Sequence, residues 1–310
     1  MVKVAVAGGT GGLGRTIIDV LEASSEHDYI ILSRESKENS PQQNVVYADY
    51  SNVDSLTQLL DKHEIHTIIS VLLIKTPEQR DAQLNLIRAA EKSSSVKRFT
   101  PSEFGPPRKD GGGDPTSELK SSAIAELESS GLEFTLFSHG LFMDYYGLPR
   151  IKSYMTHWVF AIDIKNKVAG IPGLGTGQAV YTYSGDVAKF VVATLGLPAG
   201  SWKRQSVMIG ERRSLNEVLR IAESIRGKFS VHYDSMEDLK SGKITELAPQ
   251  VAAYELSSKD EFQKRFAHFG IAMEAGAFDF QVPDDGVLLN QVFPDINPKT
   301  VEDVIREGWA

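Results

Sequence analysis

A glycine-rich segment near the N-terminus, Gly8–Gly14, constrains the fold more than any other part of the chain. It follows an apolar run, Val2–Ala7, that is typical of a buried parallel strand, and it precedes a helical pattern with Leu13, Ile17 and Leu21 on one face. A glycine turn between a strand and a helix presents backbone N–H groups and the positive end of the helix dipole, which together suit a pyrophosphate. The sequence therefore predicts a dinucleotide-binding fold; a glycine turn without a ligand is the alternative.

The glycine spacing fits two registers. Gly8, Gly11 and Gly14 match G-x-x-G-x-x-G, whereas Gly9, Gly11 and Gly14 match G-x-G-x-x-G. Both registers imply the same chemistry, because glycine permits the tight turn and the close approach of backbone to phosphate. The cofactor-binding residues predicted in this segment are Gly8, Thr10, Gly11, Gly12, Leu13 and Gly14.

Apolar runs and helical patterns alternate through the first half of the chain, as in a parallel sheet with crossover helices. Further strands are predicted at Tyr29–Ser33, Val45–Ala48, Thr67–Leu72, Lys97–Thr100 and Glu133–Phe137. The prediction is an α/β, Rossmann-type doubly wound sheet over residues 1–150. A strand near 180–210 is expected to return to this domain. A smaller α+β domain that binds substrate is expected over residues 151–310.

Two segments have a distinct local pattern. Thr76-Pro77-Glu78-Gln79 predicts a capping box with proline in the first helical position. Gly105–Pro115 is rich in glycine and proline, which excludes a helix or a central strand and predicts a mobile loop.

The end of the second predicted strand indicates which dinucleotide is bound. A carboxylate there accepts a hydrogen bond from the ribose 2′-hydroxyl of NAD, whereas an arginine pairs with the 2′-phosphate of NADP. This strand ends in Ser33 and Arg34, and Lys37 follows closely, so NADP(H) is favoured. The alternative is a surface arginine paired with Glu35 or Glu38.

Residues after the next two predicted strands are expected at the same end of the sheet. Asp49 and Tyr50 follow the third strand and are expected near the adenine, although Asp49 capping a turn is an equally good interpretation. Val71 and Leu72, at the end of the fourth strand, are expected to line the adenosine ribose.

Composition excludes several classes of function. The 310 residues carry a formal net charge of −8 and include no cysteine. Nucleic acid is therefore not expected as the main partner, and disulfides and thiolate metal sites are excluded. We predict no metal site, no membrane span and no signal peptide, in a cytoplasmic monomer or homodimer with a small-molecule substrate. The basic pair Lys97-Arg98 is expected to be solvated.

The segment Val96–Gly105, which reads VKRFTPSEFG, resembles the fifth-strand signature of the isoflavone reductase group. That group includes pinoresinol-lariciresinol and phenylcoumaran benzylic ether reductases and lies among the NmrA-like, atypical short-chain dehydrogenases. Gln83, Lys120–Glu128, Ser214–Glu217 and Phe293-Pro294 occur in the order that the family shows. The resemblance extends over essentially the whole chain and implies an NADPH-dependent reductase of a small, aromatic secondary metabolite.

The resemblance also implies site residues. Lys120 matches the lysine that contacts the nicotinamide ribose and acts as acid and base, and Phe142 matches a phenylalanine beside the nicotinamide. Further cofactor contacts are implied for Pro101, Ser102, Glu103 and Phe104. An aromatic substrate pocket is expected from Phe104, Met143, Tyr145 and Tyr146, for which core packing is the alternative.

Three observations leave the reaction open. No tyrosine precedes a lysine by four residues, and Thr116 occupies the place of the tyrosine proton donor of ordinary short-chain dehydrogenases. His139 departs from the family pattern and is either an added catalytic proton donor or a histidine satisfied by backbone. Alternatives to the reductase are an NmrA-like redox sensor without turnover and a redox-neutral isomerase or cyclase.

Overall fold

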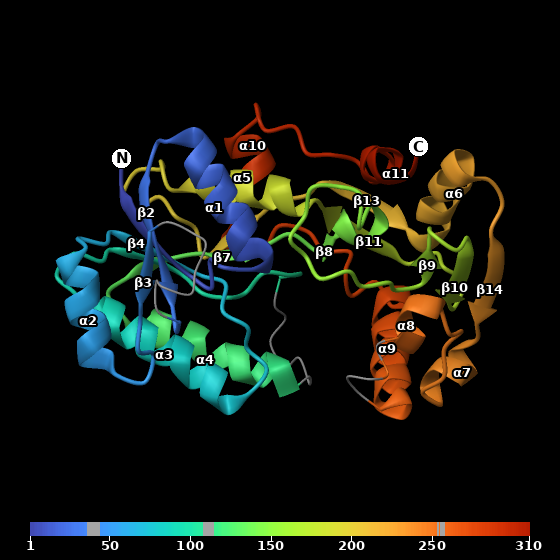
Figure 1. Ribbon diagram of the computed structural model, residues 1–310, viewed down its shortest axis with the longest axis horizontal. Coiled ribbons are helices and arrows are strands. Elements are labelled where there is room, and N and C mark those ends of the chain that lie inside the picture. The colour runs from blue at the N-terminus through green and yellow to red at the C-terminus, as the bar shows by residue number, and fades with distance from the viewer. Residues whose placement is uncertain (36–43, 108–114, 253, 255–257) are drawn as a thin grey trace. The chain divides into compact units, whose positions relative to one another are not determined.

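Six parallel strands form the main sheet in a computed structural model of the chain, which describes residues 1–35, 44–107, 115–252, 254 and 258–310 (Figure 1). Their order is β3-β2-β1-β4-β5-β6, so the sheet grows in opposite directions from β1 and β4. The strands are β1 (Lys3–Ala7), β2 (Asp28–Ser33), β3 (Val45–Tyr47), β4 (Thr67–Ser70), β5 (Arg98–Thr100) and β6 (Glu133–Phe134). This order confirms the predicted Rossmann-type doubly wound fold.

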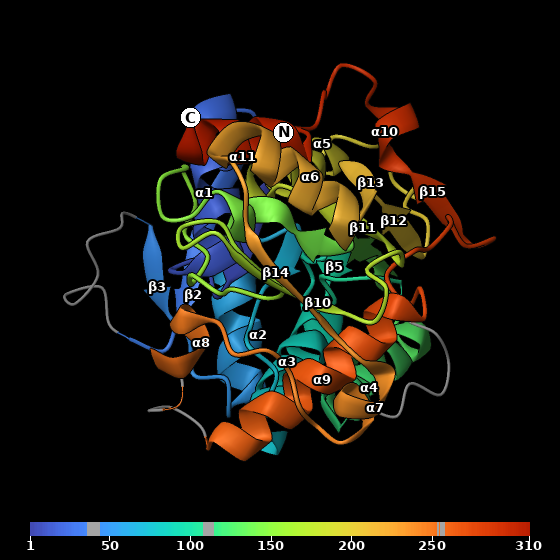
Figure 2. The same cartoon turned by 90° about the vertical axis from the view of Figure 1, so that its right-hand side faces the viewer.

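Helices cover both faces of this sheet. Helix α1 (Gly12–Ser24) lies on one face, and α2 (Val53–Lys62), α3 (Pro77–Lys92) and α4 (Pro115–Ser129) lie on the other (Figures 1 and 2). The core between the sheet and the second group is built from fully buried apolar side chains such as Leu60, Ile68, Leu86 and Phe99. Strands buried on both faces explain the continuous apolar runs of the sequence.

Helix α3 begins where the sequence predicts, but its cap is only half of a capping box. The Thr76 side chain accepts a hydrogen bond from the Gln79 backbone N–H, and Pro77 occupies the first turn. The Gln79 side chain accepts from the Lys75 backbone N–H instead of returning to Thr76.

The sixth predicted strand is divided into two. Glu133 and Phe134 pair with β5, whereas β7 (Leu136–Ser138) pairs with β12 (Gln205–Val207), which in turn pairs with β15 (Gly286–Leu288). The Leu136 backbone N–H donates to the Arg204 carbonyl at 2.9 Å, so the strand takes a distant partner at that residue. Local sequence carries no signal for such an exchange of partners.

The chain divides into two compact units. Unit 1 contains Met1–Ser138, Val187–Met208 and Val282–Ile296, and unit 2 contains His139–Asp186, Ile209–Gln281 and Asn297–Ala310. The first division falls after Ser138, whereas we predicted a domain boundary at residue 150. Strand β12 returns to unit 1 in the region predicted for a returning strand, and the segment with β15 and α10 (Leu289–Val292) returns as well.

Unit 2 mixes parallel and antiparallel pairs, as expected of an α+β unit. Its sheets have the orders β14-β10-β9 and β13-β11-β8. The strands are β8 (Leu141–Phe142), β9 (Ile162–Asp163), β10 (Val168–Pro172), β11 (Gln178–Thr182), β13 (Glu211–Ser214) and β14 (Ser230–Asp234). The helices are η2 (Met143–Tyr146), α6 (Leu215–Arg226), α7 (Met236–Lys240), α8 (Ala248–Ala252), α9 (Lys259–Glu274) and α11 (Val301–Trp309), and α5 (Ser184–Thr194) begins here and continues in unit 1.

Arg98 on β5 is buried, so the expectation of a solvated Lys97-Arg98 pair is wrong for this residue. Its side chain is 3% exposed; Nε donates to Glu133 Oε2 at 2.7 Å and Nη1 donates to the Leu197 carbonyl at 2.9 Å. The guanidinium also lies 4.8 Å from the centre of the Trp202 ring. These partners satisfy the charge inside unit 1, which composition alone does not indicate.

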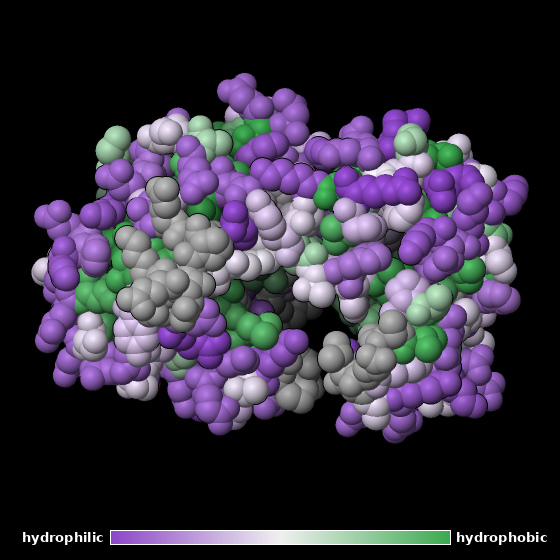
Figure 3. Space-filling view, in the orientation of Figure 1, coloured by the Kyte–Doolittle hydropathy of each residue, from purple (hydrophilic) through white to green (hydrophobic). Residues whose placement is uncertain are grey.

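Hydrophilic residues cover most of the face shown in Figure 3, and hydrophobic residues appear there as small separate groups. Across the described part of the chain, every helix is too short or too polar to cross a membrane.

Candidate functional site

Two glycines hold the β1–α1 turn against the sheet. Gly8 has φ +86°, and a Cβ there would lie 2.9 Å from the Val71 carbonyl oxygen. A Cβ on Gly14 would lie 2.3 Å from the Gly8 carbonyl oxygen. Side chains at these positions would push α1 away from β1 and β4, so both glycines are required by the fold itself. Their contacts with backbone favour the register Gly8, Gly11, Gly14 over the one that starts at Gly9.

The middle of the same turn is open. A Cβ on Gly11 or Gly12 would meet nothing within 4 Å, and Thr10 is exposed. Gly11 is the N-cap of α1 and supplies no side chain to the free N–H groups, and the first turn of α1 has no acidic residue. This arrangement leaves the positive end of the helix dipole available to an anion. Leu13, in contrast, is buried.

Ser33 and Arg34 lie at the carboxyl end of β2. The Ser33 hydroxyl accepts a hydrogen bond from the Glu35 backbone N–H at 3.1 Å. Arg34 is exposed and forms no ion pair with a carboxylate among the described residues. Burial raises the pKa of Tyr50, and the positive charge of Arg34 partly offsets this rise. Lys37, the third residue predicted here, lies outside the described residues.

Asp49 and Tyr50 are both engaged within the protein. The Asp49 carboxylate accepts from the backbone N–H and the hydroxyl of Ser51, at 3.0 and 2.6 Å, and these bonds lower its pKa. The Tyr50 ring belongs to the core of unit 1, and its hydroxyl donates to the Leu32 carbonyl at 3.3 Å. The structure thus gives Asp49 the turn-capping arrangement that the sequence left as an alternative.

A glutamine joins the loops that follow β4 and β5. Gln83 on α3 is 1% exposed, and its Oε1 accepts from the Ser70 hydroxyl at 2.8 Å and from the Ser102 backbone N–H at 2.9 Å. The Ser102 hydroxyl donates to the Leu72 carbonyl at 2.7 Å. We did not predict a site role for Gln83 from the sequence, although a polar residue on the apolar stripe of α3 was the available signal.

The segment after β5 carries the PSEFG motif. Pro101 and Ser102 are buried, whereas Glu103 and Phe104 are half-buried. The Phe104 ring stacks on Phe137, with centroids 5.9 Å apart and planes at 17°. The Gly8 turn, Val71 and this segment follow β1, β4 and β5. The predicted cofactor residues of these strands therefore lie together at the carboxyl ends of the main sheet.

Lys120 lies on α4 in unit 1 and is half-buried. It precedes Ala123 by three residues and Ile124 by four, and both are buried. Residues at this spacing share a helix face, so Lys120 extends the buried face of α4 by one turn. Thr116 lies in a part of α4 whose side chains are outside the described set.

His139 and Phe142 lie together at the beginning of unit 2. The His139 ring is 1% exposed, and its centroid is 4.2 Å from that of Phe142. Between them, Gly140 has φ +75°, and a Cβ there would lie 2.2 Å from the Val180 carbonyl oxygen. The close approach to β11 explains why glycine occupies this position.

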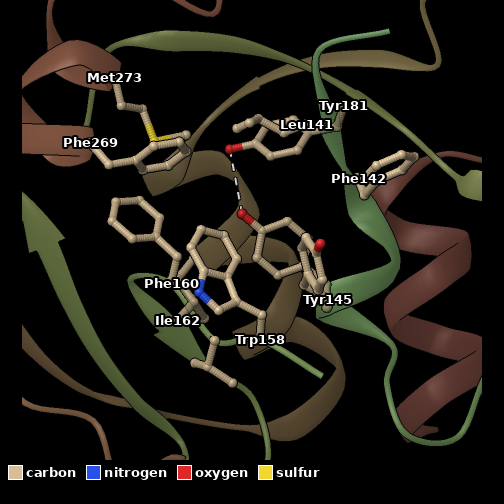
Figure 4. Close-up of a pocket in the computed structure, with 11 residues that line it drawn as sticks. Leu141, Phe142, Tyr145, Trp158, Phe160, Ile162, Tyr181, Phe269 and Met273 are labelled. Carbon is tan, nitrogen blue, oxygen red and sulfur yellow. Dashed lines mark hydrogen bonds between the residues drawn. The ribbon is translucent and has the colours of Figure 1, made fainter. Parts of the chain in front are cut away.

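Unit 2 contains a pocket lined almost entirely by aromatic and aliphatic side chains (Figure 4). The space between them is partly open to solvent. The lining residues are Leu141, Phe142, Tyr145, Tyr146, Trp158, Val159, Phe160, Ile162, Tyr181, Phe269 and Met273. Among these, Tyr145 and Tyr146 were predicted for the substrate and Phe142 for the cofactor. Met143 is instead fully buried in the core of unit 2.

The rest of this lining was missed at the sequence level. Trp158 and Phe160 belong to the short apolar run before β9, and Phe269 and Met273 come from α9, far along the chain. Trp158 makes an edge contact with Tyr145 at 5.3 Å between centroids and stacks on Phe160 at 6.0 Å. Burial and the neighbouring Asp144 charge raise the pKa of Tyr145 to about 12. The pocket therefore offers aromatic faces and neutral hydroxyls without a formal charge.

Comparison with known proteins gives the family. The model of the NmrA-like family matches residues 2–285. Oxidoreductase BOA1 of Botryotinia fuckeliana is 41% identical over 303 residues, which cover 96% of each chain. An isoflavone reductase-like protein of Olea europaea is 26% identical over 330 residues, which cover 98% of each chain. The fold resembles that of leucoanthocyanidin reductase from Vitis vinifera, with a TM-score of 0.75 and 19% identity over 98% of each chain.

The fold and these relatives define an oxidoreductase of the doubly wound α/β class. The chain belongs to the NmrA-like family, and the resemblance to the isoflavone reductase group is confirmed.

Proposed function

We propose that the protein is an NADPH-dependent reductase that transfers a hydride to a small aromatic molecule. The observation that carries the choice of cofactor is Arg34, which is exposed at the end of β2 where the 2′-substituent of the adenosine ribose is distinguished. A guanidinium forms paired, charge-assisted hydrogen bonds with a phosphate. Leucoanthocyanidin reductase, which shares the fold, has been solved as a binary complex with NADPH.

Residues at the carboxyl ends of the main sheet supply the remaining cofactor contacts in this proposal. The open turn at Gly11 and Gly12 receives the pyrophosphate, and Val71 and Leu72 lie beside the adenosine ribose. Gln83 acts as a positioning residue, because its side chain fixes Ser102 relative to the end of β4. When bound, the cofactor supplies the hydride, and the protein supplies placement and electrostatics.

Lys120 is the proposed acid and base. Its place on the half-buried face of α4, together with the family resemblance, supports a role in donating or accepting the proton that balances the hydride. His139 is the second proposed proton-transfer residue, and its buried ring beside Phe142 places it next to the aromatic pocket of unit 2. Tyr145 and Tyr146 are the proposed substrate contacts, since aromatic rings pack favourably on aromatic side chains.

A calorimetric titration with NADPH, NADP⁺, NADH and NAD⁺ at one salt concentration tests the cofactor assignment. We expect NADPH to bind about ten- to a hundredfold more tightly than NADH, which corresponds to roughly 1.5–3 kcal/mol for a charge-assisted contact. Arg34→Ala should remove this preference, whereas Arg88→Ala, which removes the same charge from the exposed face of α3, should leave it unchanged. Equal binding of NADH by the unsubstituted protein contradicts the assignment.

Turnover separates the reductase from its alternatives. With NADPH deuterated at C4 of the nicotinamide, the label should appear on carbon in the product of an aromatic substrate screen. Lys120→Met should lower the rate by about a hundredfold or more, as removal of a general acid and base does, while Lys92→Met on α3 should not. A confirmed product without label indicates redox-neutral chemistry, and tight NADPH binding without any product indicates a sensor.

A further inference from the structure

Two tyrosine hydroxyls meet inside the aromatic pocket of unit 2. The Tyr146 hydroxyl, from η2, donates to the Tyr181 hydroxyl, from β11, at 3.4 Å. Both side chains are more than nine-tenths buried, with 6% of Tyr146 and 2% of Tyr181 exposed. The dashed line in Figure 4 marks this hydrogen bond, which lies among the rings that line the pocket.

The pair has more donors than acceptors. Each phenol has one proton to donate, and their mutual hydrogen bond uses one of the two. Within the described part of the chain, neither hydroxyl has another hydrogen-bond partner. One buried O–H therefore remains without an acceptor, which costs about 1–3 kcal/mol unless a ligand or water accepts it.

No neighbouring side chain among the described residues accepts this hydrogen bond, although Tyr145, which also lines the pocket, carries a hydroxyl. Trp158, Phe160, Phe269 and Met273 surround the space and offer ring faces, ring edges and a thioether. A flat molecule can pack against these surfaces, and an oxygen or similar acceptor on that molecule can replace water as the partner of the remaining O–H.

Burial also fixes the protonation state of the pair. It raises the pKa of Tyr146 to about 12 and the pKa of Tyr181 further above its ordinary value. Both phenols are therefore neutral near pH 7, and the pair keeps a proton that it can donate to an anionic or neutral oxygen.

We propose that the Tyr146–Tyr181 pair is the polar anchor of the substrate pocket and selects aromatic molecules that carry an oxygen acceptor, such as a carbonyl, ether or phenolate oxygen. The pair holds this oxygen while the rings of Trp158 and Phe160 hold the aromatic part. The inference deepens the proposed function, on which it rests for the substrate role of the pocket, but it concerns binding and requires no hydride transfer.

The test compares two probes that differ only at the acceptor. Acetophenone carries a carbonyl where ethylbenzene carries a methylene group, and the ring and chain length are the same. Dissociation constants of both are measured by ligand-observed NMR without any nucleotide. We expect the ratio of the ethylbenzene constant to the acetophenone constant to fall about three- to tenfold in the variant Tyr146→Phe/Tyr181→Phe, as loss of one hydrogen bond predicts.

Tyr233→Phe is the matched control, because this tyrosine on β14 is exposed and donates to Asn216 outside the pocket. Its ratio should equal that of the unsubstituted protein. If the double variant does not fold, Tyr181→Phe and Tyr146→Phe are measured separately, and at least one must lower the ratio. An unchanged ratio, or no binding of either probe to the unsubstituted protein, overturns the proposal.

Failure of this inference and failure of the proposed function are distinguishable. A lowered ratio together with NADPH binding that ignores Arg34 keeps the anchor and removes the cofactor assignment. An unchanged ratio together with phosphate-selective NADPH binding keeps the reductase and removes the anchor.

Discussion

Arg98 illustrates how a single charged side chain is retained in the interior of unit 1. The guanidinium is satisfied by Glu133, by the Leu197 carbonyl and by the face of Trp202, so its positive charge has partners in several directions. Burial alone would raise the pKa of Glu133, but the hydrogen bonds from the Trp202 backbone N–H and from Arg98 lower it overall. Glu133 therefore depends on Arg98 to keep its charge in the interior.

Arg98→Ala should destabilise the protein strongly, because the Glu133 carboxylate loses its charged partner while its side chain is only 20% exposed. Removal of one member of a buried ion pair costs about 3–5 kcal/mol. Urea unfolding followed by circular dichroism measures the loss. Arg88→Ala breaks an exposed pair with Glu126 and should cost less than about 1 kcal/mol. Equal losses for the two variants contradict this account.

At the residue scale, the predictions from sequence rest on local context. The glycines of the β1–α1 turn and the arginine after β2 occupy positions whose chemistry is set by the neighbouring strand and helix. Arg98 and Tyr181 were not identified, because their partners lie far along the chain: Leu197 for the first and Tyr146 for the second. Residue type alone suggested a surface charge for Arg98.

At the scale of elements, the turn between β1 and α1 separates two roles of glycine. A side chain on Gly14 meets backbone inside the protein, whereas one on Gly11 meets open space. Gly11 also has an extended backbone, with φ −149°, that any residue can adopt. The fold thus depends on Gly14, whereas the pyrophosphate contact that we propose depends on Gly11.

Gly14→Ala should lower the free energy of unfolding by about 1–3 kcal/mol, the usual cost of overpacking. Gly11→Ala should change the free energy of unfolding by less than about 0.5 kcal/mol, since it creates no clash and changes only a surface position. The same Gly11→Ala variant should bind NADPH at least tenfold more weakly, because its methyl group occupies the space proposed for the pyrophosphate. Calorimetry and urea unfolding on both variants check these expectations, and NADPH affinity that survives Gly11→Ala would falsify the proposed phosphate position.

The first turn of α6 is fixed by a complete capping box. Glu217 Oε2 accepts from the Ser214 backbone N–H at 2.8 Å, and the Ser214 hydroxyl accepts from the Glu217 backbone N–H at 3.3 Å. The Ser214 backbone bond and the Gln178 side-chain bond lower the pKa of Glu217 from 4.5 to about 2. A depressed carboxylate pKa adds stability that is complete above the unfolded pKa and disappears as the pH falls through the folded pKa.

Glu217→Gln should therefore weaken the acid sensitivity of the protein between pH 4.5 and about 2. After allowance for solvent screening of a side chain that is 29% exposed, the contribution lost is about 1–2 kcal/mol. Urea unfolding at pH 6.5 and pH 3.5 should show a smaller difference for Glu217→Gln than for the unsubstituted protein. Glu237→Gln, on the exposed face of α7, should keep the full difference, and an equal response of both variants contradicts the assignment.

Elements were predictable where the signal is periodic and local. The five strands from β1 to β5 and the start of helix α3 lie where apolar patterns and capping residues place them. The exchange of partners between β6 and β7 was not predictable, because Glu133–Phe137 reads as one continuous strand in either arrangement. The same holds for β15, a short strand whose pairing with β12 has no counterpart in its own sequence.

At the scale of the whole molecule, each unit has its own core and a buried tryptophan. In unit 2, Trp309 of α11 packs in the core cluster, and its Nε1 donates to the Tyr146 carbonyl at 2.7 Å. In unit 1, Trp202 is buried, and its Nε1 donates to the Thr194 carbonyl at 3.1 Å. The C-terminal helix therefore supports one of the two tyrosines of the aromatic pocket.

Trp309→Ala should cost about 3–5 kcal/mol and weaken the binding of acetophenone, because it removes core volume beside Tyr146. NADPH affinity should stay within about twofold, since the residues proposed to bind the pyrophosphate and the 2′-phosphate belong to unit 1. Trp202→Ala should instead weaken NADPH binding and leave the affinity for acetophenone within about twofold. Calorimetry with the two ligands on each variant measures this, and a parallel loss of both affinities in both variants contradicts independent cores.

The interleaving of the two units has a consequence for how such proteins diversify. Unit 2 consists of three separate chain segments, His139–Asp186, Ile209–Gln281 and Asn297–Ala310, and the segments between them complete unit 1. A single genetic crossover between two relatives therefore cannot exchange one unit intact, because every junction leaves strands of one parent beside strands of the other. Exchange of the whole of unit 2 between two relatives therefore requires five junctions, one at each boundary between the units.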